Sequence, residues 1–421
     1  MAELFQTEEV KEKVILVAID QQDGIDVESS LDELSELSGT AGAETVGRLI
    51  QKREAVHPGT YIGKGKIDEL CDLIAVTQAD TVVCDDELSP AQLGNLEQVL
   101  QCKVIDRTVL ILDIFAQHAN TREGKLQVEL AQLRYRSSRL IGLRNSLSRL
   151  GGSSSGLGIG NKGLGEKKLE LDRRLIKDRM TYLYREIKDV DRAREVIRKQ
   201  RDRNTTPIIA IVGYTNAGKS TLLNHLTDAK VLEEDKLFAT LDPTTRGYEY
   251  EDGQKVLFTD TVGFINKLPH HLIDAFRSTL EEAKYADVIL HVVDSSNPKY
   301  EMHMKVVYDT LRKLGVENKP IITAFNKIDL LSYQDTYKDP MAKYTQLIAA
   351  KDGVGLQELL EKIESIANER FVTIEKVFSY NNAGKIQMIR QYGKLMVEEY
   401  QEDGIYVKAS IPQEIVGIIM Q

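Results

Sequence analysis

The chain has 421 residues, 42% of them hydrophobic and 29% charged, with a formal net charge of −10, so two to four domains with their own cores are expected. No apolar run approaches the roughly 18 residues that a membrane-spanning helix needs, and the first residues lack the parts of a signal peptide. These features exclude membrane insertion and predict a cytoplasmic protein, with peripheral association with a membrane left open.

Residues 1–118 are expected to form an α/β domain, because strand-like and helix-like runs alternate there. Gly59–Gly65 is rich in glycine but follows no clear strand, so we interpret it as a surface turn. Cys71, Cys84 and Cys102 show no CxxC spacing and are interpreted as packing residues. Strands are predicted at 14–20, 45–51, 81–84 and 102–105, and helices at 31–37, 66–76 and 90–100.

Residues 119–203 are the most basic part of the chain. Between positions 120 and 203 there are 22 Lys and Arg against 11 Asp and Glu, a balance of +11, so the remainder carries −21. Such segregation predicts contact with the phosphate backbone of RNA. The alternative is the solvated surface of charged helices.

Apolar residues at heptad spacing predict two long helices on either side of a Gly/Ser-rich tip at 151–165. Because the flexible tip lets the second helix fold back, we expect an antiparallel hairpin within a monomer and not a dimeric coiled coil. The first seam is Leu126, Leu130, Leu133, Leu140 and Leu147, and the second is Leu169, Ile176, Met180, Leu183, Ile187, Val190 and Ile197.

A phosphate-binding loop follows the apolar run 208–212 and opens a helix-like stretch at 221–226. A glycine-containing turn in this setting directs several backbone N–H groups at a triphosphate. Lys219 is expected to reach the β and γ phosphates, and the Ser220 hydroxyl to hold Mg²⁺. The loop consists of Gly213, Tyr214, Thr215, Asn216, Ala217, Gly218, Lys219 and Ser220.

Two further segments resemble nucleotide-sensing switches. Residues 238–245 are polar and without helical period, which predicts a mobile loop whose Thr240, favoured over Thr244 and Thr245, completes the Mg²⁺ shell. Asp260 ends a strand-like run and is expected to bind Mg²⁺ through water. The nucleotide-binding residues assigned here are Phe238, Ala239, Thr240, Leu241 and Asp242, then Asp260, Thr261, Val262 and Gly263.

Phe264 stands where many small GTPases have the glutamine that orients the attacking water. An aromatic ring cannot do this, so no catalytic residue is assigned with certainty, and unaided turnover should not exceed about 10⁻³ per second. A partner or an ion is expected to supply the missing stabilisation. Asn216 is a candidate K⁺ ligand, which predicts activation by K⁺ over Na⁺; bracing of the loop is the alternative.

The tetrad Asn326, Lys327, Ile328 and Asp329 follows another strand-like run and selects the base. The Asp329 carboxylate can accept hydrogen bonds from N1 and N2 of guanine, whereas adenine would present an acceptor, so GTP and GDP are the expected ligands. A last base-contacting segment is expected at Ala349, Ala350 and Lys351, where the Ala350 N–H can meet the guanine carbonyl.

The whole sequence predicts a multidomain α/β protein. Residues 204–370 are expected to form a P-loop GTPase domain with a mixed sheet and helices on both faces, including a helix at 355–367. Residues 371–421 suggest a small α+β domain with strands at 372–378 and 405–410 around a helix at 385–399. The sequence does not indicate a role for this last domain.

Several segments carry a family resemblance: residues 39–46, 57–65, 106–116 and 123–133, together with the phosphate loop and residues 238–246. Through them the chain resembles the HflX family of ribosome-associated GTPases over nearly its whole length. The resemblance implies binding to the 50S subunit and its rRNA, slow GTP hydrolysis stimulated by ribosomes, and action in ribosome splitting or rescue, protein synthesis or ribosome biogenesis. The hairpin tip departs from the family pattern, because residues 151–166 are longer and rich in serine, which leaves the rRNA contact open.

Two other functions remain as alternatives. One is a GTPase that regulates a protein partner such as a membrane protease; the +11 segment argues against it, and failure to sediment with ribosomes would favour it. The other is an RNA-remodelling nucleotidase acting through the N-terminal domain. The absence of a second phosphate loop in the sequence argues against that function.

Overall fold

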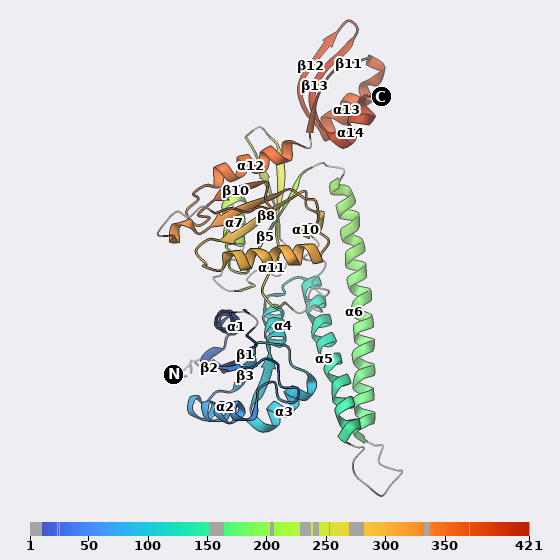
Figure 1. Cartoon of the computed structure of the whole chain (residues 1–421). Helices are drawn as coiled ribbons and strands as arrows, with labels where there is room; N and C mark the ends of the chain where they lie inside the picture. The colour runs from blue at the N-terminus through green and yellow to red at the C-terminus, as the bar shows by residue number, and fades with distance from the viewer. Residues whose placement is uncertain are drawn as a thin grey trace, which may run out of the picture. The chain divides into compact units, whose positions relative to one another are not determined.

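The computed structural model describes residues 11–22, 24, 26–150, 164–202, 206–227, 237–238, 244–251, 253–268, 282–331, 337–369 and 371–420. The chain divides into two compact units (Figure 1): the first comprises residues 1–188, 234–241 and 266–277, and the second the remainder. The hairpin tip at 151–163 lies outside the described residues, as do four of the assigned switch residues, Ala239, Thr240, Leu241 and Asp242.

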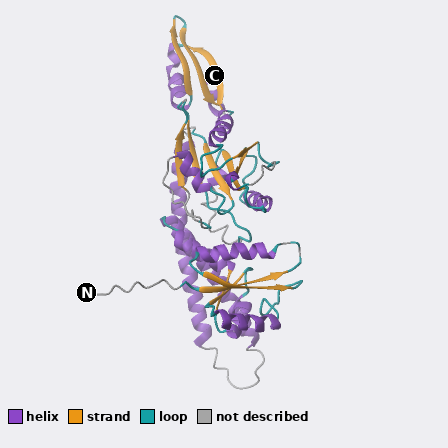
Figure 2. Cartoon of the chain, turned by 90° about the vertical axis from the view of Figure 1, so that its left-hand side faces the viewer, coloured by secondary structure: helices purple, strands orange, loops and turns teal. Residues whose placement is uncertain are grey.

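The N-terminal sheet has four parallel strands in the order β2-β1-β3-β4. Helices cover both of its faces, α1 and α4 on one and α2 and α3 on the other (Figure 2). Both faces of β1 are therefore buried, which suits its continuous apolar sequence. The strands are β1 Lys13–Asp20, β2 Glu44–Lys52, β3 Thr81–Cys84 and β4 Lys103–Asp106, and the helices are α1 Val27–Thr40, α2 Lys64–Thr77, α3 Pro90–Leu100 and α4 Arg107–His118.

Every predicted strand and helix of this domain is present, but α4 was not predicted. Most of its residues are buried, because it packs against α1, β4 and the next helix. Its exposed face is narrow, with Asp113, Ala116 and Gln117, so the sequence shows little helical periodicity. The predicted surface turn at Gly59–Gly65 is wrong in part, because Tyr61 and Ile62 are buried in the core between the sheet and α2 and α3. Cys84 is buried and Cys71 and Cys102 pack against the same core, as expected.

Helices α5 Arg122–Leu150 and α6 Leu164–Asp202 form the basic hairpin. They run antiparallel, since Arg179 donates to Glu129 at 2.6 and 2.9 Å while Arg122 pairs with Glu186. The α6 seam is confirmed where the side chains are described, because Ile176, Met180 and Leu183 are less exposed than their neighbours and Ile187 and Val190 are partly buried. The α5 seam is incomplete: α5 also packs against α3 and α4, so it buries Val128, Ala131 and Tyr135 in addition.

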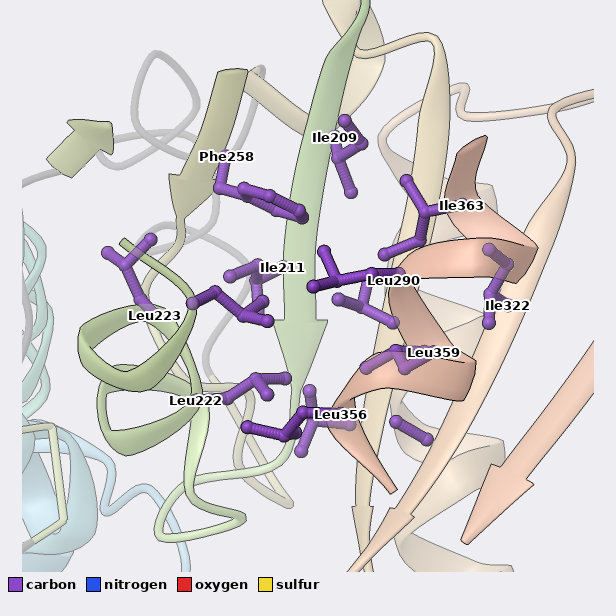
Figure 3. Close-up of a cluster of buried hydrophobic side chains, with 14 of the residues drawn as sticks. Ile209, Ile211, Leu222, Leu223, Phe258, Leu290, Ile322, Leu356, Leu359 and Ile363 are labelled. Atoms are coloured by element: carbon purple, nitrogen blue, oxygen red, sulfur yellow. The ribbon is translucent and has the colours of Figure 1, made fainter. Parts of the chain in front are cut away.

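The second unit contains a six-stranded mixed sheet in the order β10-β9-β8-β5-β7-β6, in which only β6 and β7 pair antiparallel. Helices α7 and α12 cover one face over the core shown in Figure 3, and α11 covers the other. The strands are β5 Ile208–Gly213, β6 Thr244–Glu249, β7 Lys255–Asp260, β8 Val288–Asp294, β9 Ile321–Asn326 and β10 Tyr344–Leu347; the helices are α7 Lys219–Thr227, α10 Glu282–Tyr285, α11 Tyr300–Lys313, η1 Ile328–Leu330 and α12 Leu356–Asn368.

The mixed sheet and the helix at 355–367 agree with the sequence, and two details differ. Thr244 and Thr245, expected in the mobile loop, begin β6 and pair with β7. In the C-terminal domain the predicted helix 385–399 is wrong beyond Tyr392, because Gly393 ends α13 and residues 394–401 form a strand. A Cβ at Gly393 would lie 2.6 Å from the Ser410 carbonyl oxygen, so only glycine fits beside that strand.

The C-terminal domain is a three-stranded antiparallel sheet with its helices packed on it. Its elements are β11 Phe371–Phe378, η2 Tyr380–Asn382, α13 Ala383–Tyr392, β12 Lys394–Gln401, β13 Gly404–Pro412 and α14 Gln413–Met420. None of the helices that the structure describes combines the length and apolar composition needed to cross a bilayer.

Candidate nucleotide site

The phosphate loop joins the carboxyl end of β5 to the first residue of α7. Two of its residues have positive φ, Asn216 at 58° and Gly218 at 91°. A Cβ at Gly218 would lie 2.3 Å from Asn326 Nδ2, and one at Gly213 would lie 2.3 Å from the Val292 carbonyl oxygen. The loop therefore needs glycine at both positions, because it lies tightly against the ends of β8 and β9.

Asn326 joins three of the predicted segments. Its Nδ2 donates to the Ala217 carbonyl oxygen at 2.9 Å, and its Oδ1 accepts from the Ala350 N–H at 2.9 Å. Its buried amide thus connects the phosphate loop, the base tetrad and residues 349–351. The Ala350 N–H, which the sequence assigns to the guanine carbonyl, is used for this contact.

The side chains of Lys327 and Asp329 have different surroundings. Lys327 has a φ of 66°, and its Nζ pairs with Asp294 Oδ2 at 2.6 Å. Asp329 lies in η1 with its side chain exposed, so its carboxylate is accessible to a base. Sequence reasoning did not assign Asp294, although it ends the apolar run of β8, and the carboxyl ends of parallel strands meet at one edge of a sheet.

Some of the oxygen ligands that the sequence predicts for Mg²⁺ lie close together in the structure. Ser220 Oγ donates to Asp260 Oδ2 at 3.0 Å, and Asp260 is fully buried at the end of β7. Thr244 is opposite Asp260 in the β6–β7 register, while Thr245 Oγ1 lies 3.0 Å from Thr259 Oγ1. Hydroxyl and carboxylate oxygens are the ligands that Mg²⁺ prefers, so these residues fit that ion. No cluster of three or more His, Cys, Asp or Glu side chains suited to a metal occurs among the described residues.

Lys219 is buried in the loop, where its Nζ donates to the Tyr214 carbonyl oxygen at 2.8 Å. Burial lowers the pKa of Lys219 from its usual 10.5 to about 8; the Asp260 carboxylate opposes this change and the Lys327 charge adds to it. Because the Asp260 carboxylate only partly offsets the cost of burying this charge, the ammonium attracts a further anion. A bound polyphosphate would supply that charge.

Phe264 is fixed to the phosphate loop by its backbone. Its N–H donates to the Gly213 carbonyl oxygen at 3.1 Å, and its carbonyl oxygen accepts from the Thr215 N–H at 2.8 Å. The ring is 1% exposed, so it belongs to the core and does not face a nucleotide. A Cβ at Gly263 would lie 2.8 Å from Thr215 Cγ2 and 3.2 Å from Lys219 Nζ. Gly263, Thr215 and Lys219 therefore meet at one point.

An aromatic stack supports the loop from α11. The rings of Tyr214 and His303 are stacked with centroids 3.8 Å apart and an interplanar angle of 4°. Burial lowers the pKa of His303 to about 4, so the imidazole is neutral near pH 7. Sequence reasoning missed His303, and a single histidine inside a helix carries no motif that could have revealed it. Asn216, the candidate K⁺ ligand, has an exposed side chain.

Three family models match consecutive parts of the chain. They describe a GTP-binding GTPase N-terminal region over residues 28–116, a GTP-binding GTPase middle region over 118–201 and a 50S ribosome-binding GTPase over 208–327. The strand-loop-helix that carries the phosphate loop begins the third match.

Curated relatives cover nearly all of the chain. A GTPase HflX of Lacrimispora saccharolytica is 61% identical over 99% of this chain and 97% of its own length. One of Caldanaerobacter subterraneus is 47% identical over 96% and 92%. One of Escherichia coli is 40% identical over 86% and 84%.

Proposed function

Because the chain belongs to the HflX family of GTPases, we propose that it is a GTP-controlled switch that binds the large ribosomal subunit. As a GTPase it converts GTP to GDP and phosphate. The oxygen of a water molecule forms a bond to the γ phosphorus, and the bond from that phosphorus to the β–γ bridging oxygen breaks. GDP leaves with the electron pair, and the protons of the water pass to the products.

We assign the phosphates to the loop 213–220 and guanine to Asp329, with Asn326 holding the segments together. Lys219 is the cation for the β and γ phosphates, supported by its buried ammonium. Mg²⁺ would be held by Ser220, by Thr240 and, through water, by Asp260, and when bound it neutralises phosphate charge. K⁺ beside Asn216 is proposed as the activating monovalent ion.

The observation that carries the ribosome proposal is the exposed basic surface of the hairpin. Arg173, Arg174 and Lys177 on α6 are exposed, within a segment of net charge +11 in an otherwise acidic chain. Charge of this density suits an RNA backbone, whose counterions are released on binding. The family model described as a 50S ribosome-binding GTPase supports the same partner.

Binding is tested by sedimentation with purified 50S and 30S subunits in GDP and in a non-hydrolysable GTP analogue. Reversal of Arg173, Arg174 and Lys177 to Glu should weaken 50S binding at least about tenfold and reduce its salt dependence. Reversal of Lys305, Arg312 and Lys313, which are exposed on α11, is the matched control. Equal binding of both variants, or binding that does not depend on the nucleotide, would exclude the proposal.

The output of the switch is measured in the same system. We propose that GTP hydrolysis is slow alone and faster with 50S subunits, and faster in K⁺ than in Na⁺. Ribosome splitting or rescue, a step of protein synthesis, or ribosome biogenesis would follow from binding to that subunit. Stimulation by 30S alone would contradict this assignment.

The broader assignments follow from the same reasoning. We propose four functional parts, residues 1–118, 119–203, 204–370 and 371–421, in a monomeric cytoplasmic protein. The antiparallel hairpin supports the monomer, because its two helices pair with each other within one chain through Arg179 and Glu129.

A further inference from the structure

Thr215 has a buried hydroxyl without a hydrogen-bond partner. Its side chain is 6% exposed, and Oγ1 has neither solvent contact nor a partner in the described part of the chain. A buried hydroxyl without a partner destabilises the fold, and strain, a buried water or ion, or a functional role can account for such a group in a native protein. Valine has the same shape and would avoid this cost, so packing alone does not explain a threonine at this position.

The surroundings of Thr215 indicate what the hydroxyl would meet. A Cβ atom added to Gly263 would lie 2.8 Å from Thr215 Cγ2 and 3.2 Å from Lys219 Nζ. Lys219 is assigned to the β and γ phosphates and Gly263 to the nucleotide, so the Thr215 side chain lies beside two residues of the proposed phosphate site. A rotation of about 120° about χ1 would move Oγ1 to the position that Cγ2 now occupies, and Cγ2 to that of the β hydrogen, and so would direct the hydroxyl there.

This chain lacks the glutamine side chain that orients the attacking water in many small GTPases. Phe264 occupies the position of the water-orienting glutamine, but its ring is in the core and its backbone is bonded to Gly213 and Thr215. A hydroxyl can donate one hydrogen bond and accept two. It can therefore donate to a γ-phosphate oxygen while it accepts from the attacking water.

We propose that the Thr215 hydroxyl contacts the γ phosphate and the attacking water, and that it is a catalytic residue of this GTPase. The proposal rests on the GTPase activity and adds a group to it. No bond to Thr215 forms or breaks, since the hydroxyl only orients the water and stabilises charge on the phosphate. In the structure described here the hydroxyl is turned away, which accounts for its missing partner.

The test compares Thr215→Val with Thr215→Ser in single-turnover GTP hydrolysis, GDP affinity and thermal unfolding. Thr215→Val should slow hydrolysis about 10- to 100-fold, the effect of losing one good hydrogen bond in the transition state. Its GDP affinity should stay within about twofold and its Tm should be unchanged or higher, because the orphan hydroxyl is gone. Thr215→Ser keeps the hydroxyl and should stay within about threefold of the wild-type rate.

Thr310→Val is the matched control, because its hydroxyl already donates to the Val306 carbonyl oxygen in α11 at 2.8 Å. It should leave the hydrolysis rate unchanged. A wild-type hydrolysis rate in the Thr215→Val variant, or an equal loss of rate in Thr215→Ser and Thr215→Val, would overturn the proposal. A parallel fall in GDP affinity would overturn it too, because it would indicate general damage to the loop. Since the wild type is assayed in parallel, failure of the GTPase activity itself would be seen separately.

Discussion

Affinity for GDP should decrease as the pH rises above about 8, because the free protein then loses the proton of Lys219. Burial lowers the pKa of this ammonium from 10.5 to about 8 in the free protein. Bound phosphates bring negative charge to Nζ and raise the pKa again. The Lys219 contribution to binding is therefore complete below pH 8 and is lost as the pH rises through that value.

The magnitude follows from proton linkage. If the bound pKa returns to 10.5, the full effect is about 3 kcal/mol, and affinity falls about tenfold between pH 7 and pH 9. At pH 9, binding should take up about 0.9 proton, against about 0.1 at pH 7. Calorimetry of GDP binding in buffers of different ionisation enthalpy measures this uptake directly. In the empty protein the sign is opposite: burying the charged lysine costs stability below pH 8, and this cost falls as the pH rises towards 10.5.

Lys219→Arg provides the control, since a guanidinium stays charged over this range. The guanine ring also ionises in alkaline solution, and this lowers GDP affinity in both proteins. The Lys219→Arg variant shows the pH dependence that is due to guanine and not to Lys219. Wild-type protein and Lys219→Arg should therefore diverge above pH 8. Parallel affinity curves, or no proton uptake by the wild type at pH 9, would refute the reasoning from burial.

Two further substitutions test the fold around the site and the N-terminal domain. Gly218→Ala should lower GDP affinity at least about tenfold, because its Cβ would lie 2.3 Å from Asn326 Nδ2. Gly315→Ala is the control, because Gly315 also has a positive φ, 72°, but has open space around it, so this variant should keep its affinity. Equal GDP affinities of the two variants in fluorescence titrations would contradict this. Asp106→Asn should lower the free energy of unfolding by about 3–5 kcal/mol in chemical denaturation, because the buried carboxylate accepts hydrogen bonds from Leu88, Val109, Tyr135 and Arg139. A loss no greater than that of Asp68→Asn, at an exposed position, would disprove this.

Much of the second unit could be predicted because its signals are local. An apolar strand, a glycine-containing turn and an amphipathic helix place the phosphate loop without knowledge of the remaining chain. The tetrad 326–329 begins at the last residue of β9 for the same reason, since the strand ends one residue after its apolar run. The sheet order then brings the ends of β5, β8 and β9 to one edge.

The contacts that shape the site were not predictable, because they join residues with no common pattern. The Phe264 sequence position suggested a missing function, but only the fold shows that its backbone is bonded to Gly213 and Thr215. The stack of Tyr214 on His303 connects the loop to a helix about ninety residues away. The helix predicted at 385–399 failed for a related reason: pairing of β12 with β13 decided the structure after Gly393.

The segment 106–116, which carries much of the family resemblance, begins with two charged residues whose role is structural. Arg107 is 2% exposed; its Nη1 donates to Asp85 Oδ1 at 2.9 Å, and its Nη2 pairs with Glu33. Burial alone would raise the pKa of Asp85, but the charges of Arg107 and Lys267 lower it on balance. Because a guanidinium stays charged in proteins, loss of either carboxylate would leave part of this buried charge unpaired, which destabilises the fold.

One of these partners comes from a distant part of the sequence. Lys267, four residues after Gly263, belongs to the same compact unit as Asp85 and Asp86 and lies 2.5 and 2.7 Å from their carboxylates. A movement that carries Lys267 away from Asp85 and Asp86 would break both ion pairs, and one of them is to a carboxylate that solvent does not reach. The acidic pair after β3 therefore holds Lys267 in place within its own compact unit.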